Sequence, residues 1–162
     1  MSFINNRIVP YVFKVSQVPM RFKELLKANK VYHDGMNIEN NIHGFRMRLG
    51  RAYLVFLSLW LVALVVVTIV FHGLLAKVNC HALIIMTAVI TGGFFITFSM
   101  FKESLIDRMA QQFIRKSWNR HLGLFDYDEK SKDVAHFYGE ALEKEIPIGD
   151  LQRFIFDKLS DS

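Results

Sequence analysis

Two histidines and the single cysteine of the chain lie close together in the sequence, so they are the first residues to consider as metal ligands. His72 precedes Lys77, and Cys80 and His81 follow it. Imidazole and thiolate bind zinc, but structural zinc sites use four protein ligands at characteristic spacings. These three side chains supply at most three ligands and lack such a spacing, which favours a role for the two histidines as amphipathic anchors at a membrane–water boundary. We therefore predict no metal, no cofactor and no catalytic residue here.

A second pair of side chains has the spacing of half a di-iron site. Asp133 and His136 lie one helical turn apart, but no second pair or additional helical glutamates complete such a site. The chain also lacks a glycine-rich phosphate loop and the spacing of a nucleophile motif. We predict a solvated face at Asp133 and His136, and a chain that is not an enzyme and takes no small-molecule substrate.

Two long uncharged runs dominate the rest of the sequence, which is 52% hydrophobic. They cover Ala52–Ala76 and Val78–Phe101, and lysine or arginine bounds each of them. A helix of either length exceeds the roughly 30 Å hydrocarbon core of a bilayer. A soluble chain of 162 residues would have too little other protein to cover both helices. A cleaved signal peptide is not expected, because the first run begins after residue 50.

The expected fold class is an all-α membrane protein, with an antiparallel hairpin of two transmembrane helices and amphipathic helices outside the membrane. We divide it into a basic interfacial arm (1–51), the hairpin (52–101, with spans at about 52–76 and 80–101) and a helical extramembrane tail (102–162). Lysine and arginine are more frequent beside the two outer ends of the spans than in the turn. The positive-inside rule then predicts both termini on the cytoplasmic or matrix side.

The arm is rich in basic residues, which suits an anionic membrane surface or an uncleaved mitochondrial targeting segment. Residues 20–30 predict an interfacial helix, and Val31 to Gly44 predict a loop. These charges adjoin the first expected span, which places them next to lipid headgroups. We therefore expect phospholipid partners and no nucleic acid. The residues expected at the membrane surface are Arg21, Lys23, Lys27, Arg46, Arg48, Arg51 and Lys102.

Apolar residues at helical spacing continue beyond the second span to about Trp118, and Gly123 is the expected stop. The tail then predicts a helix at Ser131 to Glu145, which Pro147 ends, and a last helix at Leu151 to Leu159, capped by Asp150. We expect no partner for their apolar stripes within the chain, so they should dock onto other membrane subunits. The expected docking residues are Phe137, Tyr138, Leu142, Leu151, Phe154 and Ile155.

Small residues in the second span suggest a place for close helix packing. Ala88, Gly92 and Gly93 form a small-xxx-small pattern, which allows another helix to approach closely. The two glycines could instead only kink the helix. The packing partner could be the first span or a foreign helix.

One stretch of the tail has a familiar order of residues. Tyr138-Gly139-Glu140-Ala141-Leu142-Glu143-Lys144-Glu145-Ile146-Pro147 follows two spans, an Asp107-Arg108 pair and an acidic link from Asp126 to Asp133. This order resembles the C-terminal part of the B14.5b family, the two-helix accessory subunits of mitochondrial respiratory complex I. The chain departs from that family by a longer N-terminal arm, a longer stretch between Asp107 and Tyr138, and an extra helix after Pro147.

The resemblance implies a non-catalytic supernumerary subunit that packs against the proton-pumping membrane arm, supports assembly and binds no cofactor. The residues alone imply a less specific version: a hairpin whose amphipathic extensions lie against other subunits. With the resemblance, the expected function is that of a structural, accessory subunit of a large inner-membrane complex of the mitochondrial respiratory electron-transport chain. The alternative is a self-assembling hairpin of a bacterial inner membrane that acts as a channel or scaffold.

Overall fold

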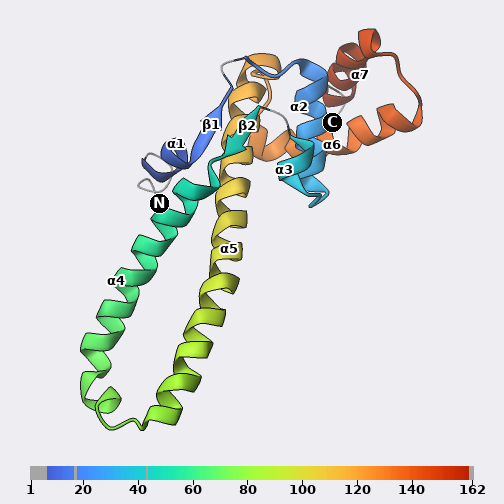
Figure 1. Cartoon of the computed structure of the whole chain (residues 1–162). Helices are drawn as coiled ribbons and strands as arrows, with labels where there is room; N and C mark the ends of the chain where they lie inside the picture. The colour runs from blue at the N-terminus through green and yellow to red at the C-terminus, as the bar shows by residue number, and fades with distance from the viewer. Residues whose placement is uncertain (1–6, 17, 43, 161–162) are drawn as a thin grey trace. The chain divides into compact units, whose positions relative to one another are not determined.

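The computed structural model describes residues 7–16, 18–42 and 44–160, and these residues are mostly helical, as predicted. Two short strands interrupt the helices before the first long one (Figure 1). The elements are α1 Val9–Val12, β1 Phe13–Val15, α2 Phe22–His33, α3 Ile38–Asn41, β2 Phe45–Met47, α4 Leu49–Leu75, α5 Cys80–His121, α6 Tyr127–Glu143 and α7 Ile148–Ser160.

The elements form two compact units, and each unit combines separate parts of the sequence. One unit contains Met1–Phe13 and Met47–Leu105, and the other contains Lys14–Arg46 and Ile106–Ser162. We call the second unit the helical domain. It joins most of the expected arm with most of the expected tail, so the structure groups the chain differently from the three consecutive segments expected from the sequence.

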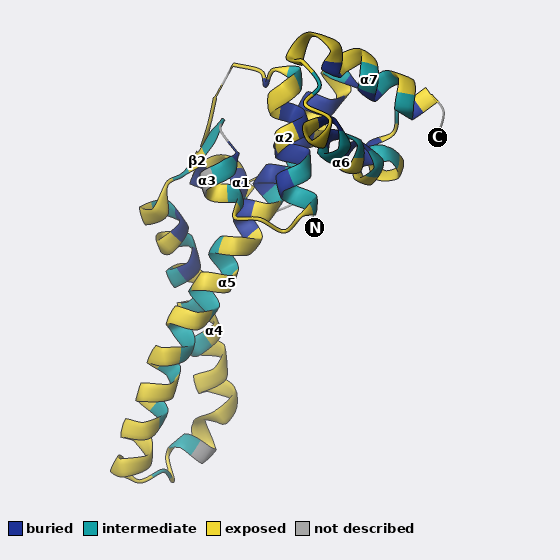
Figure 2. Ribbon diagram, turned by 90° about the vertical axis from the view of Figure 1, so that its right-hand side faces the viewer, coloured by how far each residue is buried: buried dark blue, intermediate teal, exposed yellow. Residues whose placement is uncertain are grey.

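The core of the helical domain forms where α2 packs against α6 and α6 packs against α7. Leu25 and Leu26 of α2, Val134 of α6 and Ile155 of α7 are fully buried, and Figure 2 shows buried residues on α2 and α6. Burying a side chain of this size stabilises a fold by about 1.5–3 kcal/mol. The tail stripes therefore have a partner within the chain, and the expectation that they have none is wrong. Their partner is the arm.

The same packing corrects the expectation for residues 20–30. Met20, Leu25 and Leu26 were expected to face lipid, yet all three are buried in the protein. The helix is amphipathic, as its sequence indicates, but its apolar stripe is covered by α6 rather than by a membrane. Residues 20–30 therefore do not form an interfacial helix.

The far end of α5 is anchored by a buried tryptophan. The Trp118 indole N–H donates to the carbonyl of Phe125 over 2.8 Å, and its ring meets the Tyr127 ring edge-on. Arg115 lies over the same Tyr127 ring and pairs with Asp128. The helix ends at His121, close to the expected end. Glycine suits position 123, since a Cβ there would lie only 2.6 Å from the carbonyl oxygen of Asn119.

The expected loop at 31–44 contains helical turns and leads into a strand, and its residue His43 lies outside the described residues. The helix α2 runs on to His33, and α3 forms one turn that Asn37 caps by accepting the Glu39 backbone N–H. The strands β1 and β2 then pair in a two-stranded sheet, which the sequence pattern does not predict. Gly44 bonds to the end of this sheet through its carbonyl, which accepts the Ser16 N–H over 2.7 Å.

The tail helices begin earlier than expected. The helix α6 starts at Tyr127 rather than Ser131 and ends at Glu143, four residues before Pro147. The helix α7 starts directly after Pro147, so Asp150 lies in its first turn and is not its cap. Glu140 connects the two helices, since its carboxylate lies 2.5 Å from the Lys144 amine and 3.2 Å from the Lys158 amine. These two lysines hold the pKa of Glu140 below its usual value.

A few polar groups are buried between α2 and α6. The Asn29 amide donates to the Ser131 carbonyl over 2.6 Å, across 102 residues of sequence. Among the described residues, Asn29 Oδ1, His33 Nε2 and the Tyr127 hydroxyl are buried without a hydrogen-bond partner. Burial raises the pKa of Tyr127 to about 12. Burial and the nearby charge of Lys132 lower the pKa of His33 below 6.5, with Asp34 opposing them.

Replacing Gly44 by alanine should destabilise the helical domain. Gly44 has φ +124°, and a Cβ there would overlap the ring of Phe113. Backbone strain and overpacking each cost about 1–3 kcal/mol. Gly35→Ala is the matched control, because Gly35 has φ +65° but nothing within 4 Å of a Cβ. The full chain in detergent can be unfolded with denaturant and monitored by tryptophan fluorescence. We expect the free energy of unfolding to fall clearly more for Gly44→Ala than for Gly35→Ala. Equal losses would contradict the close contact with Phe113.

Acidification should weaken the helical domain through His33. Above pH 6.5 the imidazole is neutral in both the folded and the unfolded chain, but below it the unfolded chain binds the proton more readily. The free energy of unfolding should therefore fall as the pH is lowered from 7.5 to about 5.5, a range above the titration of most carboxylates. His33→Gln should flatten this slope, and His136→Gln, at an exposed position of α6, should not. A slope unchanged by His33→Gln would exclude this residue as its source.

Candidate functional site

Two helices are long and apolar enough to cross a membrane. They are Leu49–Gly73 within α4, with 25 residues, and α5. At about 1.5 Å per residue, 25 residues reach about 38 Å, which exceeds a hydrocarbon core of roughly 30 Å. Only 6% of the most apolar window of the first helix and 0% of that of the second are buried, so the described chain does not form a core around either helix. Figure 2 shows the exposed residues along α4.

The exposed surface of these helices is aliphatic and aromatic. Ile69 and Val70 in α4 and Ile84 and Val89 in α5 are each more than two-thirds exposed. Soluble monomers rarely expose apolar patches that extend so far along two helices. Hydrocarbon would accept this surface without the cost of hydrating it.

Aromatic rings make the contact between α4 and α5. The Phe56 ring lies between 5.2 and 5.4 Å from the rings of Phe94, Phe98 and Phe101, and Trp60 meets Phe94 edge-on. Pairs of this kind add about 0.5–1.5 kcal/mol each beyond simple burial. The sequence reasoning did not identify this cluster, although its members recur at helical spacing on both runs. The rings that take part are Tyr53, Phe56, Trp60, Phe94, Phe98 and Phe101.

The small residues expected to pack closely against a helix do not meet α4. A Cβ added at Gly92 or at Gly93 would have no atom within 4 Å, and Ala88 is exposed. The helix α5 continues through both glycines. Within the described chain, this face is therefore open.

The residues first considered as metal ligands lie on both sides of the turn between α4 and α5: His72 in the last turn of α4, and Cys80 and His81 at the start of α5. The Cys80 sulfur lies 3.5 Å from His81 Nδ1, and both side chains and His72 are exposed. Among the described residues, no group of three or more His, Cys, Asp or Glu side chains is arranged to hold a metal ion. The Asp133 and His136 pair belongs to no such group either.

The basic residues expected at a membrane surface are mostly exposed. Arg51 packs on another residue, Tyr11. Its guanidinium lies 4.8 Å from the centre of the Tyr11 ring and donates to the Tyr11 carbonyl over 3.2 Å. This stacking fixes the start of α4 against α1. The exposed residues of the set are Arg21, Lys23, Lys27, Arg46 and Arg48, and Lys102 is half-buried.

The expected docking residues fall into three groups by burial. Tyr138, Leu151 and Ile155 are buried in the helical domain, so they are not free to bind a partner. Phe137 and Phe154 are half-buried, and each ring centre lies 5.8 Å from the Lys158 amine. Leu142 is exposed. Sequence reasoning identified the stripes correctly but not what covers them.

The residues chosen from the sequence thus separate into a buried set within the helical domain and an open set along α5 and at the basic positions. The open set contains Ala88 and Gly92, which lie on one face of α5. This face offers a surface for packing rather than groups for chemistry. No protein-family model, curated protein sequence or solved structure matches this chain.

Proposed function

We propose that the chain is a non-catalytic membrane subunit, in which α4 and α5 form an antiparallel transmembrane hairpin and the helical domain lies outside the bilayer. The exposure of both apolar windows carries this proposal. With 6% and 0% of these windows buried, the chain itself does not cover them, and a bilayer would.

The hairpin is also supported by which segments of the chain make up the helical domain. The domain combines residues before α4 with residues after the apolar part of α5. Two segments that fold into one compact unit must lie on the same side of a membrane. The chain between them must then cross the membrane an even number of times, as two spans do.

The charge distribution supports an orientation for this hairpin. Arg46, Arg48 and Arg51 precede the first span, Lys102 and Arg108 follow the apolar part of the second, and the turn holds only Lys77. The positive-inside rule favours the turn on the side away from the cytosol or matrix. Together with the resemblance to B14.5b subunits, this supports a mitochondrial inner membrane, with both termini in the matrix.

The open face of α5 supports a role in assembly. Small residues let helix backbones approach closely in lipid, where dispersion contacts drive association. A face with Ala88 and Gly92 that does not meet α4 is suited to a helix of another subunit. We therefore infer an accessory subunit that stabilises a large membrane complex, in our proposal one of the respiratory chain, with phospholipids filling the remaining surface.

The same face also suits a second copy of the chain, which would make a self-assembling bacterial scaffold or channel. Cys80 is exposed, so cross-linking through its thiol can distinguish the two proposed functions. Oxidative cross-linking in native membranes should give Cys80–Cys80 dimers if copies assemble symmetrically, and should not give them if one copy is present in each complex.

Gly92→Leu should release the chain from its complex without unfolding it. The added side chain has room in the isolated chain, since a Cβ meets nothing within 4 Å, but it would block a closely packed partner. Native gel electrophoresis of mildly solubilised membranes should show the tagged wild-type chain in a large complex and the variant at low mass. Thermal unfolding of the purified chain should change by no more than about 0.5 kcal/mol.

Gly73→Leu is the matched control, because Gly73 is also exposed on an apolar helix with nothing within 4 Å of a Cβ. We expect this variant to remain in the complex. If the wild-type chain migrates only as a free monomer, the proposed function is wrong. If Gly73→Leu dissociates as readily as Gly92→Leu, the packing face is not the one proposed.

A further inference from the structure

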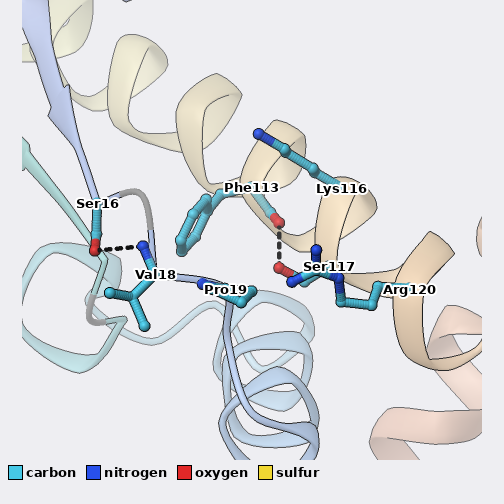
Figure 3. A pocket seen from close by; sticks show the side chains of 7 residues that line it. All are labelled: Ser16, Val18, Pro19, Phe113, Lys116, Ser117 and Arg120. Carbon is cyan, nitrogen blue, oxygen red and sulfur yellow. Dashed lines mark hydrogen bonds between the residues drawn. The ribbon is translucent and has the colours of Figure 1, made fainter.

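A small pocket in the helical domain combines positive charge with an apolar floor. Its volume is about 160 Å³, and it lies between the segment that precedes α2 and the far part of α5. Figure 3 shows its walls, with two cationic side chains on the same helix as a phenylalanine ring. The lining residues are Ser16, Val18, Pro19, Phe113, Lys116, Ser117 and Arg120.

The two cations of the pocket come from one helix, α5. Lys116 and Arg120 are four residues apart on α5, so their charges lie on one face of the helix and repel each other. In the described part of the chain neither forms an ion pair. The neighbouring Arg115, by contrast, pairs with Asp128. Elsewhere in the domain, Lys30 pairs with Asp34 over 3.0 Å.

The hydroxyls of the pocket differ in what they can offer. The Ser117 hydroxyl donates to the Phe113 carbonyl over 3.0 Å, so its proton is already used. The Ser16 oxygen accepts the Val18 N–H over 3.2 Å, which leaves its own proton free to donate. A guest would therefore meet hydrogen-bond donors from Ser16, Lys116 and Arg120, and would need to be an acceptor with negative charge.

We propose that this pocket binds a phosphate monoester group. A phosphate monoester carries a charge of about −1.5 to −2 at pH 7, which would relieve the repulsion between the two cations better than a carboxylate. The guanidinium of Arg120 can bind two phosphate oxygens at once, and the Lys116 amine adds a point charge. Val18, Pro19 and Phe113 could contact the apolar part of the molecule that carries the phosphate.

The phosphate could come from a small soluble compound or from the headgroup of a lipid such as phosphatidic acid. Calorimetric titration of the full chain in nonionic detergent separates these sources. One arm uses inorganic phosphate, the second uses short-chain phosphatidic acid, and short-chain phosphatidylcholine is the reference. Binding of inorganic phosphate supports a soluble ligand, and binding of phosphatidic acid alone supports a lipid headgroup.

The double variant Lys116→Gln/Arg120→Gln should bind either phosphate probe at least about tenfold more weakly, because it loses two charge-assisted contacts. Lys132→Gln/Arg153→Gln is the matched control: it also removes one lysine and one arginine, from exposed positions of α6 and α7 outside the pocket. We expect the control to change affinity by less than about twofold.

The variant Lys116→Arg/Arg120→Lys keeps both charges and should retain most of the binding, which guards against a loss caused by misfolding. Circular dichroism should be the same for all three variants. The proposal is overturned if the wild-type chain binds neither phosphate probe, or if the control loses as much affinity as the pocket variant.

Discussion

The packing of α2 against α6 is the interaction on which the rest of the helical domain depends. It buries Leu25, Leu26 and Val134 and joins Asn29 to Ser131, two residues separated by 102 positions. Without it, the arm and the tail would each hold amphipathic helices too short to be stable in water. With it, residues from before α4 and from after the apolar part of α5 form one compact unit. Asn29 Oδ1, His33 Nε2 and the Tyr127 hydroxyl are buried without a hydrogen-bond partner among the described residues, and each unpaired atom lowers the stability gained from this core.

Local features of the sequence predicted the elements of the chain well. Two uncharged runs predicted α4 and α5, because helix length and apolar composition are properties of a single segment. Helical spacing likewise predicted the extension of α5 past the apolar run, and the tail helices to within a few residues. Errors at helix ends, such as α6 beginning at Tyr127, arise because capping depends on a few backbone contacts.

Features that depend on distant segments could not be predicted in this way. An amphipathic stripe shows that a surface must be covered, but not whether lipid, another protein or the chain itself covers it. The stripe of residues 20–30 was therefore assigned to a membrane, although α6 covers it. The pairing of β1 with β2 and the meeting of Ser16 with Lys116 at one pocket depend on the same long-range folding. The aromatic contact between Phe56 and Phe94 was open to prediction, because rings recur at helical spacing on both runs.

The bond between Asn29 and Ser131 also has a consequence for biosynthesis. A ribosome that adds about 5–20 residues per second needs several seconds to make the chain that separates these two partners. During that time the arm has been made but α6 has not, and the apolar stripe of α2 is uncovered while α4 and α5 are synthesised. The nascent arm must be shielded or rest on a surface until the tail arrives. The helical domain can therefore close only after both α4 and α5 have been made.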